Sequence, residues 1–234
     1  MVTMRFKKHH AWNVSAGEAV EIQKRLYPLL NLKEFSGPIN YVAGTDISFS
    51  KDSDLLWAGV TVFSYPDLVK IEERCIRDVT RFPYIPGLLS FREVPGIIKV
   101  LKQLKTEPDL ILCDGQGIAH PRGLGLASHL GLFIDKPTIG CAKSRLVGQF
   151  SEVGNIKGDY VSLLIKGEVK GAVLRTRTGT KPLFISPGNR ITLDHSLKVV
   201  MACCDKYRIP KPIRETHLLV NRRRREDRER MSRS

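Results

Sequence analysis

The order of strand-like and helix-like segments constrains the fold of this chain more than any other feature of its sequence. Three segments between residues 40 and 79 show β-branched alternation and are joined by short connections, which predicts an antiparallel meander. From residue 91 onward, helical and strand-like patterns alternate. A meander followed by such an alternation favours an α/β fold in which helices cover both faces of one mixed sheet.

The boundaries of the expected elements follow from apolar periodicity, capping signals and turn residues. A capping box at residues 15–18 starts the first helix, which ends near Asn31. The other expected helices are residues 91–104, 122–133, 192–206 and 213–225. The expected strands are residues 40–50, 55–65, 68–79, 108–113, 137–143, 159–165, 169–175 and 182–186.

Positive charge is the main compositional signal. The 234 residues include 38 Lys and Arg against 24 Asp and Glu, a formal charge of +14, which points to a polyanionic partner. Residues 221–234 contribute seven arginines and three acidic residues, so +10 remains on residues 1–220. No Ser/Gly linker interrupts the chain, and we expect one folded domain over residues 1–221. Residues 222–234 form an Arg-rich tail that either frays or ends a helix.

Signals for secretion or membrane insertion are not found in the sequence. The first 18 residues lack the apolar segment of a signal peptide, and no later run approaches the roughly 20 apolar residues of a membrane span. The five cysteines form no C-x-x-C pair, so we expect small buried hydrophobes in a reducing compartment. Burial is also favoured over a redox role for the adjacent Cys203 and Cys204. A cytoplasmic protein is expected.

Two aspartates lie in or directly after expected strands, at positions where a carboxylate can have a functional role. Asp46 lies inside an apolar strand and shares a face with Gly44 and Ser48, which would leave room for a ligand. A bond from Asp46 to a loop amide is an equally good explanation. Asp114 follows a short apolar strand and precedes Gly115, at the end of a strand where α/β proteins collect functional groups. The alternative for Asp114 is an Asx-type turn.

Three further polar residues admit both a chemical and a structural role. Glu93 fits a capping box with Ser90, but if it faces the two aspartates, three carboxylates would form an oxygen-rich site suited to Mg²⁺. Separation along the chain does not decide between the two. His217 is a base, a metal ligand or a surface residue of the last helix. Lys143 either balances phosphate charge or simply ends a strand.

Residues 82–87, Phe-Pro-Tyr-Ile-Pro-Gly, form a segment whose two prolines fix the backbone around a Tyr-Ile pair. Such a rigid apolar projection is a means of prying bases apart, although composition alone favours a buried loop plug. The glycines of residues 115–125 permit close approach of the backbone to a ligand, but the run matches no standard phosphate loop.

Six segments of the chain together closely resemble the endonuclease V family of inosine-directed nucleases. The matching segments are Val42-AGTDISFS, Pro83-YIPGLLSFRE, Asp109-LILCDGQGIAHPRGLGLASHLG, Lys136-PTIGCAKSRLVG, Ile185-SPGNRITL and Tyr207-RIPKPIRETH. They occur in order between about residue 42 and residue 217. The resemblance implies a ribonuclease H-like fold, a mixed central sheet flanked by helices, with residues 1–221 as the catalytic domain.

The resemblance also implies the roles of individual residues. Asp46, Glu93 and Asp114 would hold Mg²⁺, for which Mn²⁺ would substitute, with His217 as the catalytic histidine and Lys143 beside the phosphate. Substrate would be bound by a strand-separating wedge and by a pocket for flipped hypoxanthine, formed by Pro83, Tyr84, Ile85, Pro86, Gly87, Leu88, Leu89, Gly117, Ile118, His120 and Arg122.

The leading interpretation is a Mg²⁺-dependent endonuclease that starts DNA repair. By resemblance, it would hydrolyse the second phosphodiester bond 3′ to inosine in DNA, leave a 5′-phosphate end, and act as a monomer. A ribonuclease specific for inosine-containing RNA is the first alternative. A noncatalytic basic nucleic-acid-binding protein is the second, and three carboxylates disfavour it because a pure binder gains nothing from acidic groups facing phosphate.

Overall fold

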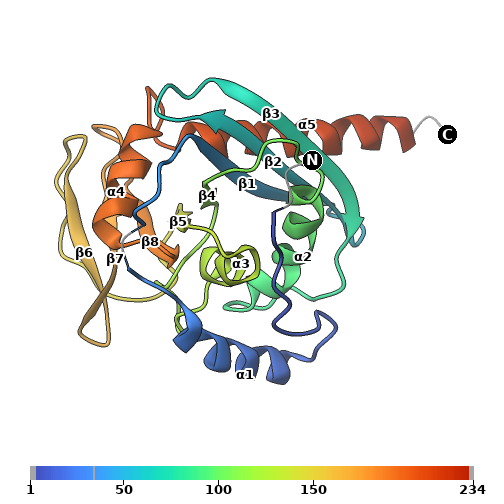
Figure 1. Cartoon of the computed structure of the whole chain (residues 1–234), viewed down its shortest axis with the longest axis horizontal. Helices are drawn as coiled ribbons and strands as arrows, with labels where there is room; N and C mark the ends of the chain where they lie inside the picture. Colours follow the sequence, from blue (N-terminus) through green and yellow to red (C-terminus); the bar gives the residue numbers. More distant parts are fainter. Residues whose placement is uncertain (1–3, 34, 232–234) are drawn as a thin grey trace.

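A computed structural model describes residues 4–33 and 35–231. Its centre is one eight-stranded sheet in the order β3-β2-β1-β4-β5-β8-β7-β6 (Figure 1). β1 pairs in parallel with β4, and β4 with β5, whereas the other pairs are antiparallel. The expected α/β fold with a mixed central sheet flanked by helices is confirmed. None of the described helices has the length and apolarity needed to cross a bilayer.

The strands and helices have the following bounds. The strands are β1 Tyr41–Phe49, β2 Leu55–Ser64, β3 Lys70–Val79, β4 Leu110–Cys113, β5 Thr138–Ala142, β6 Tyr160–Ile165, β7 Glu168–Leu174 and β8 Leu183–Asn189. The helices are α1 Ala16–Leu26, α2 Leu89–Leu101, α3 Leu126–Ile134, α4 Leu193–Ala202 and α5 Lys211–Met231, with a 3₁₀ turn at Tyr27–Leu29. The predicted capping box of α1 is present, because Ser15 accepts from the Glu18 amide.

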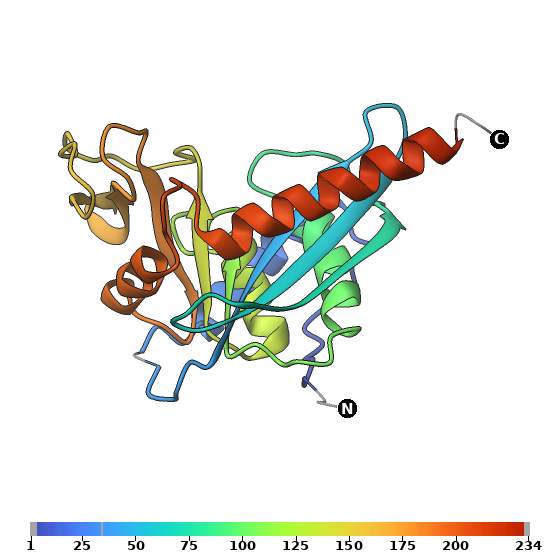
Figure 2. The same cartoon turned by 90° about the horizontal axis from the view of Figure 1, so that it is seen from above.

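The side chains of β1 alternate between two helical layers. Ala43 and Ile47 face a core with α2 and α3, which includes Val94 and Leu130. Val42, on the other face, belongs to a second core that contains residues of α4 and the start of α5. Figures 1 and 2 show α5 lying obliquely across β1 and β2, with its C-terminal end projecting beyond the sheet. The central strands therefore carry functional groups between two packed layers.

Several helices differ in their bounds from the prediction, including α2, which spans Leu89–Leu101 instead of residues 91–104, and α4, which ends at Ala202 instead of residue 206. α3 starts at Leu126 instead of residue 122, because Gly123 has a φ of 71° and Gly125, the N-cap, is extended. α5 runs from Lys211 to Met231, longer than the predicted 213–225. Residues 222–231 of the predicted tail thus continue a helix, and the last three tail residues lie outside the described part of the chain.

The cysteines are thiols that form no disulfide bond. Four of the five cysteines are buried and Cys75 is partly buried, and burial raises the pKa of Cys113 to about 12.

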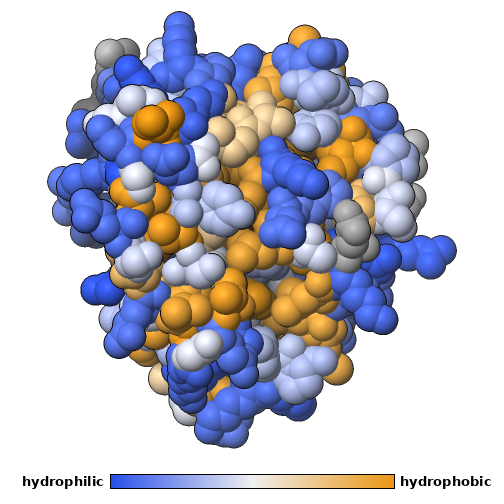
Figure 3. All heavy atoms as spheres, turned by 90° about the vertical axis from the view of Figure 1, so that its left-hand side faces the viewer, coloured by the Kyte–Doolittle hydropathy of each residue, from blue (hydrophilic) through white to orange (hydrophobic). Residues whose placement is uncertain are grey.

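On the side of the molecule that bears β6 and β7, hydrophobic residues are interspersed with hydrophilic ones (Figure 3). The exposed apolar side chains there include Ile156, Leu164 and Val169.

Candidate active site

The parallel pairing of β1 and β4 brings Asp46 and Asp114 together. The register pairs Thr45 with Cys113, and the aspartates are the next residue on each strand. Adjacent strands lie about 4.8 Å apart, so the two carboxylates leave the sheet at one place. Both side chains are largely buried, with 11% and 15% of their surface exposed. The charge of two carboxylates is thereby concentrated where the short strand β4 ends.

Glu93 is the third carboxylate of this cluster. It projects from α2, and the pKa of its carboxyl is raised well above the ordinary value, first by burial and then by repulsion from Asp46 and Asp114. The capping-box alternative is wrong, because the N-cap of α2 is Leu88 and makes no side-chain cap. The Ser90 hydroxyl lies instead 2.9 Å from Nδ1 of His129. Glu93 is thus free of any capping role and faces the aspartates.

His217 reaches the cluster from α5. Its Nδ1 donates a hydrogen bond to Asp46 Oδ2 at 2.7 Å, and this bond raises the pKa of the imidazole. Asn221 lies one turn later, donates from Nδ2 to Nε2 of His217 at 3.1 Å, and accepts a hydrogen bond from Ser48. Asn221 is a site residue that the sequence analysis missed, although its spacing of four from His217 places both on one helix face.

Lys143 lies at the end of β5 and forms an ion pair with Asp114. Burial raises the pKa of the Asp114 carboxyl, while the Lys143 ammonium opposes that rise. With 42% of its side chain exposed, Lys143 contacts both the buried aspartate and solvent. The ammonium is therefore placed to meet an anionic group that approaches Asp114 from outside.

The three carboxylates are the candidate ligands for a metal ion. They offer hard oxygen ligands, which Mg²⁺ prefers, and their mutual repulsion favours a bound cation. Lys143 forms an ion pair with Asp114, and His217 donates a hydrogen bond to Asp46. In the described part of the chain, no group of three or more His, Cys, Asp or Glu side chains is arranged so that it could hold a metal ion as it stands. The fit to a divalent cation therefore rests on the chemistry of the three oxygen donors.

The predicted room beside Asp46 is occupied by α5. A side chain at Gly44 would meet the backbone of Pro212 and Ile213, so Gly44 allows the close approach of the helix. Ser48 is bonded to Asn221 rather than left open. The expectation that Gly44 and Ser48 make space for a ligand is wrong, because these small residues serve helix docking.

A pocket of about 350 Å³ opens beside the carboxylates. Residues 82–87 and the start of α2 contribute five lining residues, namely Tyr84, Ile85, Pro86, Gly87 and Leu89. His120 also lines the pocket. Asp114 and Lys143 form the side nearest the cluster. The pocket therefore adjoins the acidic site at Asp114 and Lys143.

Tyr84 projects from the molecule. Its side chain is 68% exposed, whereas Phe82 is buried in an aromatic contact with Phe91. The interpretation of this segment as a buried plug is therefore wrong for Tyr84 and describes only Phe82. Pro83 and Pro86 are exposed on either side of the tyrosine. The segment is a rigid projection anchored by one buried ring.

The carbonyl of Gly87 fixes the pocket end of this projection. It accepts hydrogen bonds from Gln23 of α1 at 3.0 Å, His120 Nε2 at 2.9 Å and Arg122 at 2.8 Å. Burial lowers the pKa of His120 to about 4, so its neutral ring donates from Nε2 and accepts the Arg122 amide at Nδ1. Gln23 was not predicted, since a polar residue within an amphipathic helix gives no sequence signal.

Several predicted substrate residues lie outside the pocket lining. Pro83 is on the outer surface, Leu88 is buried, and Arg122 supports Gly87 from behind. Gly117 and Ile118 donate their amides to β8, the former to Ser186 and the latter to Pro187. The residues that line the pocket without having been predicted are Ser90, Gly115, Gln116, Leu124, Gly125, Leu126, Ala142, Ser144, Arg145 and Leu146. Sequence spacing could not reveal residues 144–146, because that segment comes from a different loop.

The chain as a whole is similar to proteins of one known family. The family model described as Endonuclease V matches residues 22–218. Endonuclease V of Nostoc punctiforme is 49% identical over 212 residues, which cover 90% of this chain and 96% of that protein. The crystal structure of the Bacillus subtilis protein is 33% identical, with a TM-score of 0.92 over 97% of this chain and 100% of that one.

A more distant solved structure adds a ligand. Endonuclease V of Ciona intestinalis, 27% identical with a TM-score of 0.80, covers 90% of this chain and 98% of its own length. It was crystallised with a 24mer DNA containing an inosine followed by a ribo-adenosine. The family match covers most of the sequence, and the chain therefore belongs to the endonuclease V family.

Proposed function

We propose that this protein is a Mg²⁺-dependent endonuclease that recognises inosine in DNA and hydrolyses the second phosphodiester bond on its 3′ side, which initiates repair. The observation that carries the proposal is the position of the base-sized pocket next to Asp114 and Lys143, beside the carboxylates of Asp46 and Glu93. The inosine-containing DNA bound by the Ciona relative supports the choice of substrate.

In this proposal Asp46, Glu93 and Asp114 hold the cation. Bound there, Mg²⁺ supplies Lewis-acid stabilisation of the charge that develops on the phosphate, and Mn²⁺ supplies the same chemistry. The burial of the carboxylates excludes much of the water that would otherwise screen their charge.

His217 and Lys143 complete the proposed chemistry. His217 is held by Asp46 at Nδ1 and by Asn221 at Nε2, so its ring is oriented, and Nε2 is the atom that takes up or releases a proton. Lys143 places an ammonium beside Asp114, where it neutralises a non-bridging phosphate oxygen. Both groups act without moving a helix, since each already contacts an aspartate.

The pocket and the wedge account for base selection. A flipped hypoxanthine enters the 350 Å³ pocket while Tyr84 fills the space it leaves in the stack. Extruding a base costs a few kcal/mol, and less for a weak pair such as inosine makes, which contributes to selectivity. The positive charge of the protein supplies affinity for phosphates of any sequence.

A ribonuclease acting on inosine in RNA is the second candidate. The observation that favours it is the ribose that follows inosine in the ligand of the Ciona relative. A noncatalytic binder is disfavoured by the buried carboxylates, which repel phosphate unless they hold a cation.

The deciding experiment is a nicking assay on matched strands with inosine in DNA, inosine in RNA, and adenine in DNA. We expect Mg²⁺-dependent nicking of inosine DNA, lost in Asp46→Asn and Asp114→Asn but retained in Asp135→Asn, a carboxylate paired with Lys7 and Arg190 away from the site. Nicking by the two site variants would reject the metal assignment. Cleavage confined to inosine RNA would favour the ribonuclease.

A further inference from the structure

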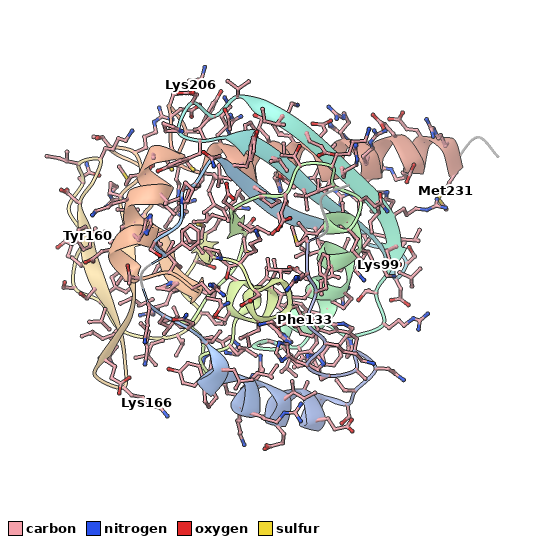
Figure 4. All side chains as sticks on the ribbon, in the orientation of Figure 1. Lys99, Phe133, Tyr160, Lys166, Lys206 and Met231 are labelled. Carbon is pink, nitrogen blue, oxygen red and sulfur yellow. The ribbon has the colours of Figure 1, made fainter. Side chains whose placement is uncertain are left out.

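The C-terminal end of α5 and the β1–β2 turn enclose a second cleft, of about 570 Å³. Four cationic side chains line it, Lys51 from the turn and Arg224, Arg225 and Arg228 from the helix, against one acidic residue, Asp52. Figure 2 shows this end of α5 beside the turn, and Figure 4 labels Met231 at its tip. Four cations against one anion make the cleft an attractive site for an anionic ligand.

Two acidic residues of the same stretch of α5 already have partners. Glu226 pairs with Arg223 at 3.2 Å, and Asp227 accepts a hydrogen bond from the Trp57 indole at 2.7 Å. Arg222 pairs with Glu73 of β3 at 3.1 Å. Within residues 4–33 and 35–231, no acidic partner is found for Arg225 or Arg228, whose side chains are exposed. Arg222 and Arg223 therefore form a paired set, whereas Arg224, Arg225 and Arg228 face the cleft.

The cleft lies in line with the candidate active site. His217, Asn221, Arg224 and Arg228 follow one another at steps of four, three and four, so they share one face of α5. At 1.5 Å per residue, Arg224 and Arg228 lie about 10 and 16 Å from His217 along the helix axis. A DNA strand advances about 3.4 Å per nucleotide, so these distances correspond to roughly three to five nucleotides.

We propose that this cleft is a second phosphate-binding site, which holds the DNA backbone three to five nucleotides from the bond that is cut. The inference rests on the proposed function, because it places the scissile phosphate beside His217. The family match ends at residue 218, so the arginines of the cleft lie beyond the part of the chain that defines the family.

The test compares two variants that lose the same charge from the same helix. Arg225→Gln/Arg228→Gln removes two cations from the cleft, and Arg222→Gln/Arg223→Gln removes two from the paired set. Binding is measured in Ca²⁺ as a function of salt, on inosine duplexes with flanks of two or ten base pairs on either side. Each phosphate contact contributes about 0.9 to the slope of log affinity against log salt.

We expect the cleft variant to bind the long duplex about tenfold more weakly and with a slope about 1.8 shallower, while the short duplex is bound as by wild type. The control variant should change the slope by less than half as much. Equal effects of the two variants, or equal losses on both duplexes, would overturn the proposal. Circular dichroism of each variant checks that the helix is intact.

Failure of the proposed function gives a different result. If wild-type protein nicks no inosine substrate, the nuclease assignment fails, yet the two variants still differ on plain duplex DNA if the cleft binds phosphate. If nicking occurs and the variants bind alike, the nuclease assignment stands and the cleft proposal is rejected.

Discussion

Among single residues, Glu93 occupies an environment that is unfavourable to a negative charge. It is the group on which the two aspartates and burial act together, so its carboxylate raises the energy of the folded protein. Arg92, the next residue, opposes this effect. A group that costs stability and yet faces two other carboxylates is typical of a functional position.

Glu93→Gln should separate activity from stability. We expect nicking to fall by about 10²–10³-fold, because a preorganised charge at the site is lost. Since the substitution removes buried repulsion, the Tm should rise by about 2–4 °C, the shift that about 1 kcal/mol produces in a chain of this size. Single-turnover nicking and thermal unfolding test both parts, with Glu21→Gln on α1 as a control. A variant that is active and less stable would contradict the assignment.

Tyr84→Ala tests base extrusion apart from metal chemistry. If the ring replaces lost stacking, worth about 1–3 kcal/mol per base, the loss should be large for inosine in a duplex and smaller in a single strand. Because Tyr84 is 68% exposed, the substitution should change the free energy of unfolding by less than about 0.5 kcal/mol.

The control for Tyr84 is another exposed tyrosine. Tyr160 stands on β6 at the outer edge of the molecule, with 55% of its surface exposed (Figure 4). Tyr160→Ala should leave cleavage of both substrates unchanged. If Tyr84→Ala loses the same fraction of cleavage on duplex and single-stranded inosine substrates, Tyr84 does not replace the stacking of the extruded base.

At the scale of elements, α5 connects the site to the β1–β2 turn. Arg224 donates to the Phe49 carbonyl at 2.8 Å, and the buried Trp57 indole donates to Asp227. These bonds hold the last turns of a helix whose sequence there has no apolar face. Side-chain hydrogen bonds and ion pairs therefore extend α5 beyond its hydrophobic contacts.

Asp227→Ala should show how much the hydrogen bond between Trp57 and Asp227 contributes to stability. It leaves the Trp57 N–H without an acceptor, which costs about 1–3 kcal/mol of stability. Urea unfolding measures the loss, and Asp227→Asn, which keeps an acceptor oxygen, should recover most of it. If alanine and asparagine behave alike, the hydrogen bond does not stabilise the fold.

The elements also show what the sequence can and cannot predict. β1 to β3 follow from period-2 patterns, and β4 from an apolar run that ends at Asp114. The start of α3 was missed because it depends on the positive φ of Gly123, and the length of α5 because Arg222–Arg225 carry no apolar period. The meeting of Asp46, Glu93 and Asp114 depends on strand order and helix packing, which separation along the chain does not contain.

For the whole molecule, buried neutral histidines couple stability to pH. His120 has a pKa of about 4 in the folded protein against an ordinary value of 6.5, and the pKa of buried His129 is lowered well below that value. The charges that act on them are Arg122 on His120, and His9, His10 and His120 on His129. The unfolded chain therefore binds more protons than the folded one below pH 6.5.

The free energy of unfolding should consequently be highest above pH 6.5 and fall as the pH drops toward 4. For His120 alone the loss is on the order of 3 kcal/mol. Urea unfolding between pH 7.5 and 4 measures it, and His120→Asn should show a shallower dependence on pH than wild type. An identical dependence in the variant would exclude His120 as a contributor.

The sheet lies between two helical layers that each supply part of the site. Glu93 comes from the α2 side and His217 from the α5 side, and only the strands between them bring both to Asp46. Detachment of either layer from the sheet separates these groups, even where most of the structure persists. We therefore expect nicking only from fully assembled molecules, so that partly unfolded intermediates, which still carry the basic charge that attracts DNA, leave it intact.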